Sequence, residues 1–197
     1  ETQFFARYLA SRYPGTVKAN PKDIDAIVVT HGDADHFAGL MEMFKSEMNI
    51  NASKRFFMRP LRVYHNGLVK RPSLTRTRER RKEKALLGNC QKLANRTIVT
   101  GLVENLIAMP DRELNAPFRD WKAILGQYQE RHPVDFRRLR RGDDEAFNFL
   151  ADESIQVEVL GPITTRVRGK EALEFLVEEA GRPIWDPEFL HPETRRS

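Results

Sequence analysis

The chain has 197 residues, of which 40% are hydrophobic and 31% charged, and its formal net charge is +5. This length allows one domain with a core of its own, and the composition is too apolar for a fully disordered protein. No apolar run approaches the roughly 20 residues that cross a bilayer. Because Cys90 is the single cysteine, an internal disulfide and a cysteine-based zinc cluster are excluded. We therefore expect a chain without a membrane segment, located in a reducing, bacterial-type cytoplasm.

The first elements predict an α/β layered fold. Aromatic and apolar residues at helical spacing predict a helix over 4–12, which ends at Pro14-Gly15. A β-branched run predicts a buried strand over 24–30, and apolar residues at helical spacing predict a helix over 37–47. This helix–strand–loop–helix order is typical of a fold with a largely buried sheet.

The rest of the chain continues the mixture of helices and strands. We expect strands over 55–58 and 61–64, a strand over 97–100, a helix over 117–131, strands over 136–139 and 155–160, and a helix over 170–180. The helix over 117–131 has one apolar face, which we expect in the core and which consists of Phe118, Trp121, Ile124, Leu125 and Tyr128.

Four side chains that can bind a metal follow the strand expected over 24–30: His31, Asp33, Asp35 and His36. We call the segment from His31 to His36 the metal motif. The carboxyl end of a strand is where ligands bind in α/β sheets. In an extended loop, residues two apart point the same way, so His31 and Asp33 can share one metal while Asp35 and His36 turn toward a second. Two such metals can share a bridging water and lower its pKa. Asp35 is then the candidate catalytic residue, because its carboxylate can orient or deprotonate that water.

The segment over 27–40 reads Ile-Val-Val-Thr-His-Gly-Asp-Ala-Asp-His-Phe-Ala-Gly-Leu and resembles the metallo-β-lactamase superfamily. That superfamily carries His-x-His-x-Asp-His after a hydrophobic strand, followed by a small residue, Gly and an apolar residue. Asp33 stands in place of the second histidine, a variant similar to the hydrolase domain of the DNA-uptake channel proteins of bacterial competence. The resemblance implies an αββα sandwich, with His31 and Asp33 on the first metal and Asp35 and His36 on the second.

The metals implied are two divalent ions, and a carboxylate in place of an imidazole weakens the case for zinc and strengthens that for manganese. The alternative is that Asp33 and Asp35 cap the following helix and complement its dipole. No Gly-Asp pair follows a hydrophobic strand further on, because Gly142-Asp143 follows a run of arginines. We therefore expect a single, incomplete metallo-β-lactamase-like domain over 1–197 that holds half of a dimetal site.

Other histidines are weaker candidates. His65 ends the strand expected over 61–64 and could be a metal ligand from an adjacent strand, although most such histidines are structural. His132 ends a helix, where a cation is favourable, and His191 lies in a segment without periodicity.

A basic insertion is expected over 70–84, where eight basic residues stand against two glutamates. Such a segment could follow a phosphate backbone, and the candidate nucleic-acid contacts in it are Arg76, Arg78, Arg80 and Arg81. It contains no aromatic residue for base stacking, and charge runs are more often solvated surface. A second basic group consists of Arg137, Arg138, Arg140 and Arg141. Convergence of the two groups beside the metal motif would favour a polyanionic substrate.

The leading hypothesis is a metal-dependent hydrolase that acts on a phosphodiester or another polyanionic substrate. Ester, lactone and thioester hydrolysis stay open because one fold supports many chemistries, whereas Asp33 and the basic insertion argue against β-lactams. The alternatives are a catalytically inert binding or assembly module with the same fold, and a nucleic-acid-binding protein without hydrolysis.

Overall fold

The computed structural model describes residues 2–32, 34–72, 90–93, 96–173 and 176–177. The basic insertion expected over 70–84 therefore lies outside the described residues from 73 onward. Within the described part, no helix is both long and apolar enough to cross a membrane.

The elements alternate between helices and strands, as expected from the sequence. The helical segments are α1 (Thr2–Arg12), α2 (Ala34–Ser46), α4 (Ala116–Arg131) and the 3-10 segments η1 (Ala52–Lys54), η2 (Asp111–Glu113) and η3 (Asp144–Glu153). The strands are β1 (Lys22–Ile24), β2 (Ile27–Val29), β3 (Met58–Pro60), β4 (Arg62–His65), β5 (Cys90–Leu93), β6 (Arg96–Val99), β7 (Asp135–Arg138), β8 (Thr164–Val167), β9 (Lys170–Leu173) and β10 (Leu176–Val177). The mixed α/β class with parallel sheets is thus confirmed.

A parallel sheet in the order β2-β4-β7 forms the centre of the molecule. The strand expected over 24–30 is divided, since β1 pairs with β3 and β2 pairs with β4, both parallel. The interruption is slight, because the amide of Leu61 still donates to the carbonyl of Ile24 at 2.9 Å. The burial expected for this strand was partly wrong, as Val29 is buried but Val28 is 47% exposed. All three strands of the central sheet end at one edge, where Val29 lies beside His65 and His65 beside Arg138.

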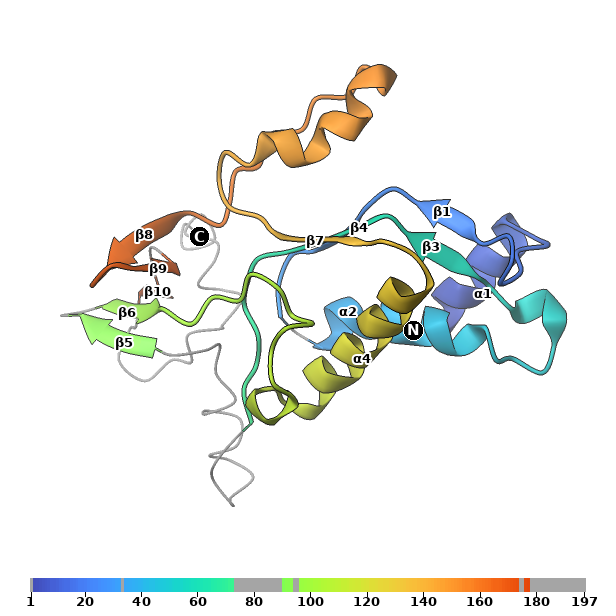
Figure 1. Ribbon diagram of the computed structural model, residues 1–197, viewed down its shortest axis with the longest axis horizontal. Helices are drawn as coiled ribbons and strands as arrows, with labels where there is room; N and C mark the ends of the chain where they lie inside the picture. The colour runs from blue at the N-terminus through green and yellow to red at the C-terminus, as the bar shows by residue number, and fades with distance from the viewer. Residues whose placement is uncertain (1, 33, 73–89, 94–95, 174–175, 178–197) are drawn as a thin grey trace, which may run out of the picture.

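Helices α2 and α4 cover one face of this sheet (Figure 1). The apolar face predicted for α4 is confirmed, because all five of its residues are buried. Phe37 of α2 is fully buried and stacks on Trp121 of α4, with 4.8 Å between ring centroids. The helix that follows the metal motif is therefore fixed to the core one residue after His36.

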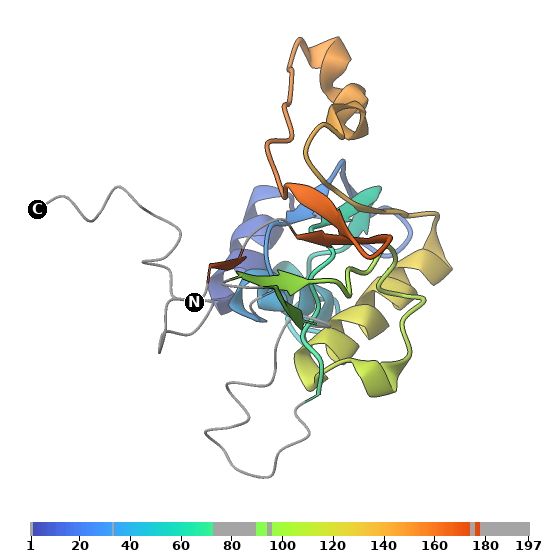
Figure 2. The same cartoon turned by 90° about the vertical axis from the view of Figure 1, so that its left-hand side faces the viewer.

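The opposite face of the sheet contacts η3, whose far end projects from the body (Figure 1, orange; Figure 2). Tyr64 of β4 packs edge-on against Phe147 and donates its hydroxyl hydrogen to the carbonyl of Ala146 at 2.7 Å. The strand expected over 155–160 was wrong, since no ladder forms there. The amide of Val159 donates instead to the carboxylate of Asp144, at 2.6 Å.

The helix expected over 170–180 was also wrong where the structure describes it, because β8 and β9 form an antiparallel hairpin. Arg168 and Gly169 connect the two strands, and both have positive φ angles, of 50° and 76°. Two such residues make the tight turn that fits the twist of a hairpin. The strand expected over 97–100 is confirmed as β6, whereas its partner β5 was not foreseen.

Candidate metal centre

The metal motif joins the central sheet to α2. Strand β2 ends at Val29 and α2 begins at Ala34, three residues earlier than the sequence suggested. Asp35 and His36 therefore lie in the first helical turn rather than in an extended loop. Asp33 lies outside the described residues, as do the side chains of Asp35 and His36. Their roles as ligands, and that of Asp35 as catalytic residue, stay predictions.

His31 is the candidate ligand of the motif whose surroundings the structure describes. Its Nδ1 lies 3.1 Å from the hydroxyl oxygen of Thr30, the preceding residue. If Nδ1 carries the proton, it donates a hydrogen bond to the Thr30 hydroxyl oxygen, and the free lone pair is on Nε2. A metal-bound histidine typically has this arrangement, with one ring nitrogen on the metal and the other hydrogen-bonded to the protein.

Asn66 is a positioning residue that the sequence analysis missed. Its amide nitrogen donates to the carbonyl of Thr30 at 2.6 Å, and its amide oxygen accepts from the backbone of Leu68 at 2.9 Å. One side chain thus ties the start of the metal motif to the end of β4. The Asn66-Gly67 pair after a strand was the signal, since such pairs form turns.

His65 is held by two hydrogen bonds within the chain. Its Nδ1 accepts from the amide of Gly67 at 3.0 Å, and its Nε2 lies 3.2 Å from the carbonyl of Glu104, to which Nε2–H can donate. Burial lowers the pKa of His65, and the nearby Arg138 cation lowers it further, against the raising effect of Glu104. A neutral imidazole with both nitrogens engaged favours a structural role, and metal ligation would require His65 to give up one of these bonds.

A pocket of about 270 Å³ opens at the carboxyl edge of the central sheet, beside the start of the motif. Its walls come from the ends of β2, β4 and β7 and from the segment before β8, and they include Val29, Thr30, His65, Asn66, Leu139 and Pro162. Ligands of open parallel sheets bind at this edge, so the motif has a hollow next to it in which a substrate could lie.

Acidic side chains compensate three of the four arginines in the second basic group. Arg137 pairs with Glu145, while Arg140 pairs with Glu171 and lies 3.6 Å from Asp143. Arg138 is the most enclosed of the group: its side chain is 2% exposed and pairs with both Glu104 and Glu171. Glu104 and Glu171 lie 34 and 33 residues from Arg138 in the sequence, and Asp143 lies in a turn. The spacing of residues in the sequence does not predict such ion pairs.

Glu171 of β9 receives three hydrogen bonds, from Arg138, Arg140 and Thr164. Its partial burial raises the pKa, but these three donors outweigh that effect and lower the pKa to about 2. The carboxylate is therefore ionised throughout the neutral range and fixes two cations and a hydroxyl at the sheet edge.

This shift predicts a pH dependence of stability. A folded-state pKa of about 2, below the ordinary 4.5, means that Glu171 stabilises the fold above pH 4.5 and loses that contribution as the pH falls toward 2. The difference in unfolding free energy between the wild type and Glu171→Gln should therefore be largest near neutrality and shrink toward pH 2. Urea unfolding over this range measures it, and a difference independent of pH would contradict the assignment.

The donor set of the motif fits a divalent metal, because two imidazoles and two carboxylates are ligands that zinc and manganese accept. Among the described residues, no group of three or more histidine, cysteine or acidic side chains forms a metal site. Since three of the four proposed ligand side chains lie outside that part of the chain, a site built on the motif is not tested by this finding.

The structure thus combines a mixed α/β fold with a candidate metal-binding motif at the carboxyl edge of a parallel sheet. The family model of the metallo-beta-lactamase superfamily matches residues 3–52, about a quarter of the chain. This match spans α1, the motif and α2, and it supports the superfamily resemblance. No curated protein and no solved structure matches the chain, so the closer resemblance to competence proteins has no support from them.

Proposed function

We propose that this chain contributes to a metal-dependent hydrolase, with His31, Asp33, Asp35 and His36 as the ligands of two divalent ions. The observation that carries the proposal is the position of the motif, which runs from the loop after β2 into the first turn of α2. A superfamily match over the same segment supports it.

A bound divalent metal would supply a water of lowered pKa and polarise the bond to be cleaved. The residues of this chain would hold the metal and orient its ligands. Thr30 orients the ring of His31, and Asn66 fixes the backbone of Thr30 to β4. Phe37 packs in the core and so fixes the position of α2, the helix to which Asp35 and His36 belong. The proposed catalytic role of Asp35 is to accept a proton from the attacking water.

Metal binding tests the proposal directly. We expect the protein, purified and supplied with manganese or zinc at neutral pH, to retain metal in elemental analysis. His31→Ala and Asp35→Ala should lower metal affinity by at least about tenfold, since even changes behind the ligands cost that much. Asp120→Ala is the matched control, because Asp120 is an exposed residue of α4.

Absence of bound metal in the wild-type protein would overturn the enzyme proposal and favour an inert binding or assembly module. Equal metal affinity in Asp120→Ala and Asp35→Ala would remove Asp35 from the ligand set. Circular dichroism of each variant establishes that a lost metal is not a lost fold.

The proposed substrate class is a phosphodiester or another polyanion. The basic segment over 70–84 supports it, with Arg76, Arg78, Arg80 and Arg81 as the proposed nucleic-acid contacts. The narrower resemblance to competence hydrolases rests on Asp33 and stays a prediction.

A further inference from the structure

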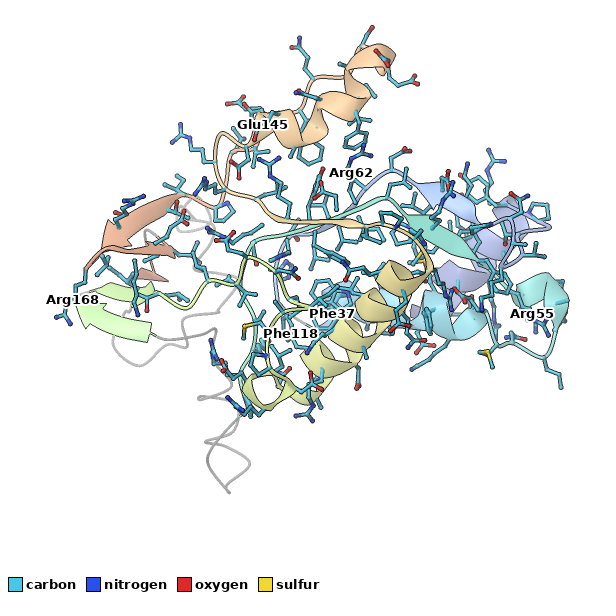
Figure 3. The ribbon with its side chains drawn as sticks, viewed as in Figure 1. Phe37, Arg55, Arg62, Phe118, Glu145 and Arg168 are labelled. Carbon is cyan, nitrogen blue, oxygen red and sulfur yellow. The ribbon has the colours of Figure 1, made fainter. Side chains whose placement is uncertain are left out.

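A hollow of about 640 Å³ lies between the end of β7 and the β8–β9 hairpin. Its lining is mostly basic and hydroxylic and includes Arg140, Arg141, Arg166, Thr164, Thr165 and Glu171. The hairpin that forms one wall lies at one end of the molecule in Figure 1, and Figure 3 marks its tip at Arg168. Three arginines against a single glutamate give this hollow a surplus of positive charge.

Two of these arginines have no carboxylate partner among the described residues. They are Arg141 and Arg166, and both are exposed. Arg166 lies directly across the ladder from Glu171, so both side chains are on the same face of the hairpin. The carboxylate of Glu171 is already bound by Arg138, Arg140 and Thr164, which leaves the Arg166 cation available to an outside anion.

Glu171 gives the hollow a fixed geometry rather than a loose group of surface charges. It holds Arg140 from β9 while Asp143 approaches the same guanidinium from the turn after β7. Its lowered pKa keeps this contact ionised at neutral pH. A guanidinium already oriented by carboxylates loses less conformational entropy when it binds an anion.

The same backbone joins this hollow to the candidate metal centre. The amide of Arg141 donates to the carbonyl of Pro162 at 3.0 Å. Leu139 and Pro162 line the pocket beside the metal motif, whereas Arg141 and Thr164 line the basic hollow. Both hollows are therefore lined by residues of the same pair of hydrogen-bonded segments.

We propose that Arg140, Arg141 and Arg166 form a phosphate-binding site that holds an anionic group of a ligand next to the metal motif. Arginine forks bind phosphate oxygens in pairs, and the threonine hydroxyls can donate further hydrogen bonds. The phosphate belongs to a small phosphorylated compound or to a phosphodiester chain. The role of this site in binding the substrate of the hydrolase rests on the proposed function, whereas anion binding itself does not.

The test uses the full chain at low ionic strength with EDTA and no added metal. Calorimetry measures binding of inorganic tripolyphosphate, and fluorescence anisotropy measures binding of a short labelled oligodeoxynucleotide. The double variant Arg141→Gln/Arg166→Gln should lower affinity for tripolyphosphate by about tenfold, because charge-assisted hydrogen bonds to two cations are lost. Arg112→Gln, an exposed arginine of η2, is the matched control and should bind as the wild type does.

The basic segment is the competing source of anion affinity, so a variant with Arg76, Arg78, Arg80 and Arg81 all changed to Gln is measured in parallel. Loss of tripolyphosphate binding in that variant, with full binding in the double variant, would overturn the inference, as would a wild type that binds neither probe. Tighter binding of the oligodeoxynucleotide than of tripolyphosphate, lost in the double variant, identifies a phosphodiester ligand. Similar affinities identify a small phosphorylated one. Because no metal is present, failure of the metal test leaves this result unaffected.

Discussion

Phe37→Ala should lower the free energy of unfolding by about 3–5 kcal/mol, as expected for a phenylalanine removed from a packed core. Phe37 is completely buried, and its ring lies 4.8 Å from that of Trp121 and 4.9 Å from that of Phe118, measured between centroids. The cavity would open where α2 meets α4 (Figure 3), directly after the metal motif. Urea unfolding followed by tryptophan fluorescence measures the loss.

Phe4→Ala is the matched control, because Phe4 is 71% exposed on α1 and its truncation should change stability by less than about 0.5 kcal/mol. Equal losses in the two variants would contradict the placement of α2 against α4. If the proposed function holds, Phe37→Ala should also weaken metal binding in the protein that stays folded, since Asp35 and His36 begin the same helix.

The buried face of α4 was predictable because apolar residues that recur at helical spacing indicate which face of a helix is buried. The five apolar residues of α4 recur at helical spacing, and all of them are buried. The segment after β8 shows where this reasoning fails. Ala172, Leu173, Leu176 and Val177 suit one face of a helix, yet the turn at Arg168-Gly169 makes the first two part of a hairpin. Local turn geometry decided between helix and strand, and apolar spacing did not carry that information.

The candidate site was predictable in its ligand sequence but not in its surroundings. The motif from His31 to His36 stands out because four potential ligands lie in six residues. Asn66 contacts Thr30 from 36 positions away, and that contact depends on the parallel pairing of β2 with β4. The run Arg137–Arg141 suggested a basic surface, but its spacing did not show that three of its arginines meet carboxylates from other parts of the fold. Such partners become visible only when the strands are placed.

Arg138→Met should be the second severe change, with a loss of about 3 kcal/mol in unfolding free energy. Its side chain is 2% exposed, and it bridges Glu104 and Glu171. Removing one partner of a buried ion pair leaves the other charge without compensation, which costs roughly 3–5 kcal/mol. The lower end applies here because the side chain of Glu104 is 72% exposed and water can solvate it. Gly67 makes room for this arginine, since a Cβ there would lie 2.3 Å from its Cδ.

Arg137→Met is the control for this prediction, because Arg137 is the preceding residue of the same strand and forms an ion pair with the exposed Glu145. Exposed pairs contribute about 0–1 kcal/mol, so the two neighbouring variants should differ several-fold in their effect on urea unfolding. The double variant Arg138→Met/Glu171→Gln should regain part of the loss, since it removes the carboxylate that the first change leaves uncompensated. Equal effects at 137 and 138, or no recovery in the double variant, would show that Arg138 does not hold β7, the β8–β9 hairpin and the segment of Glu104 together at the edge where the metal motif lies.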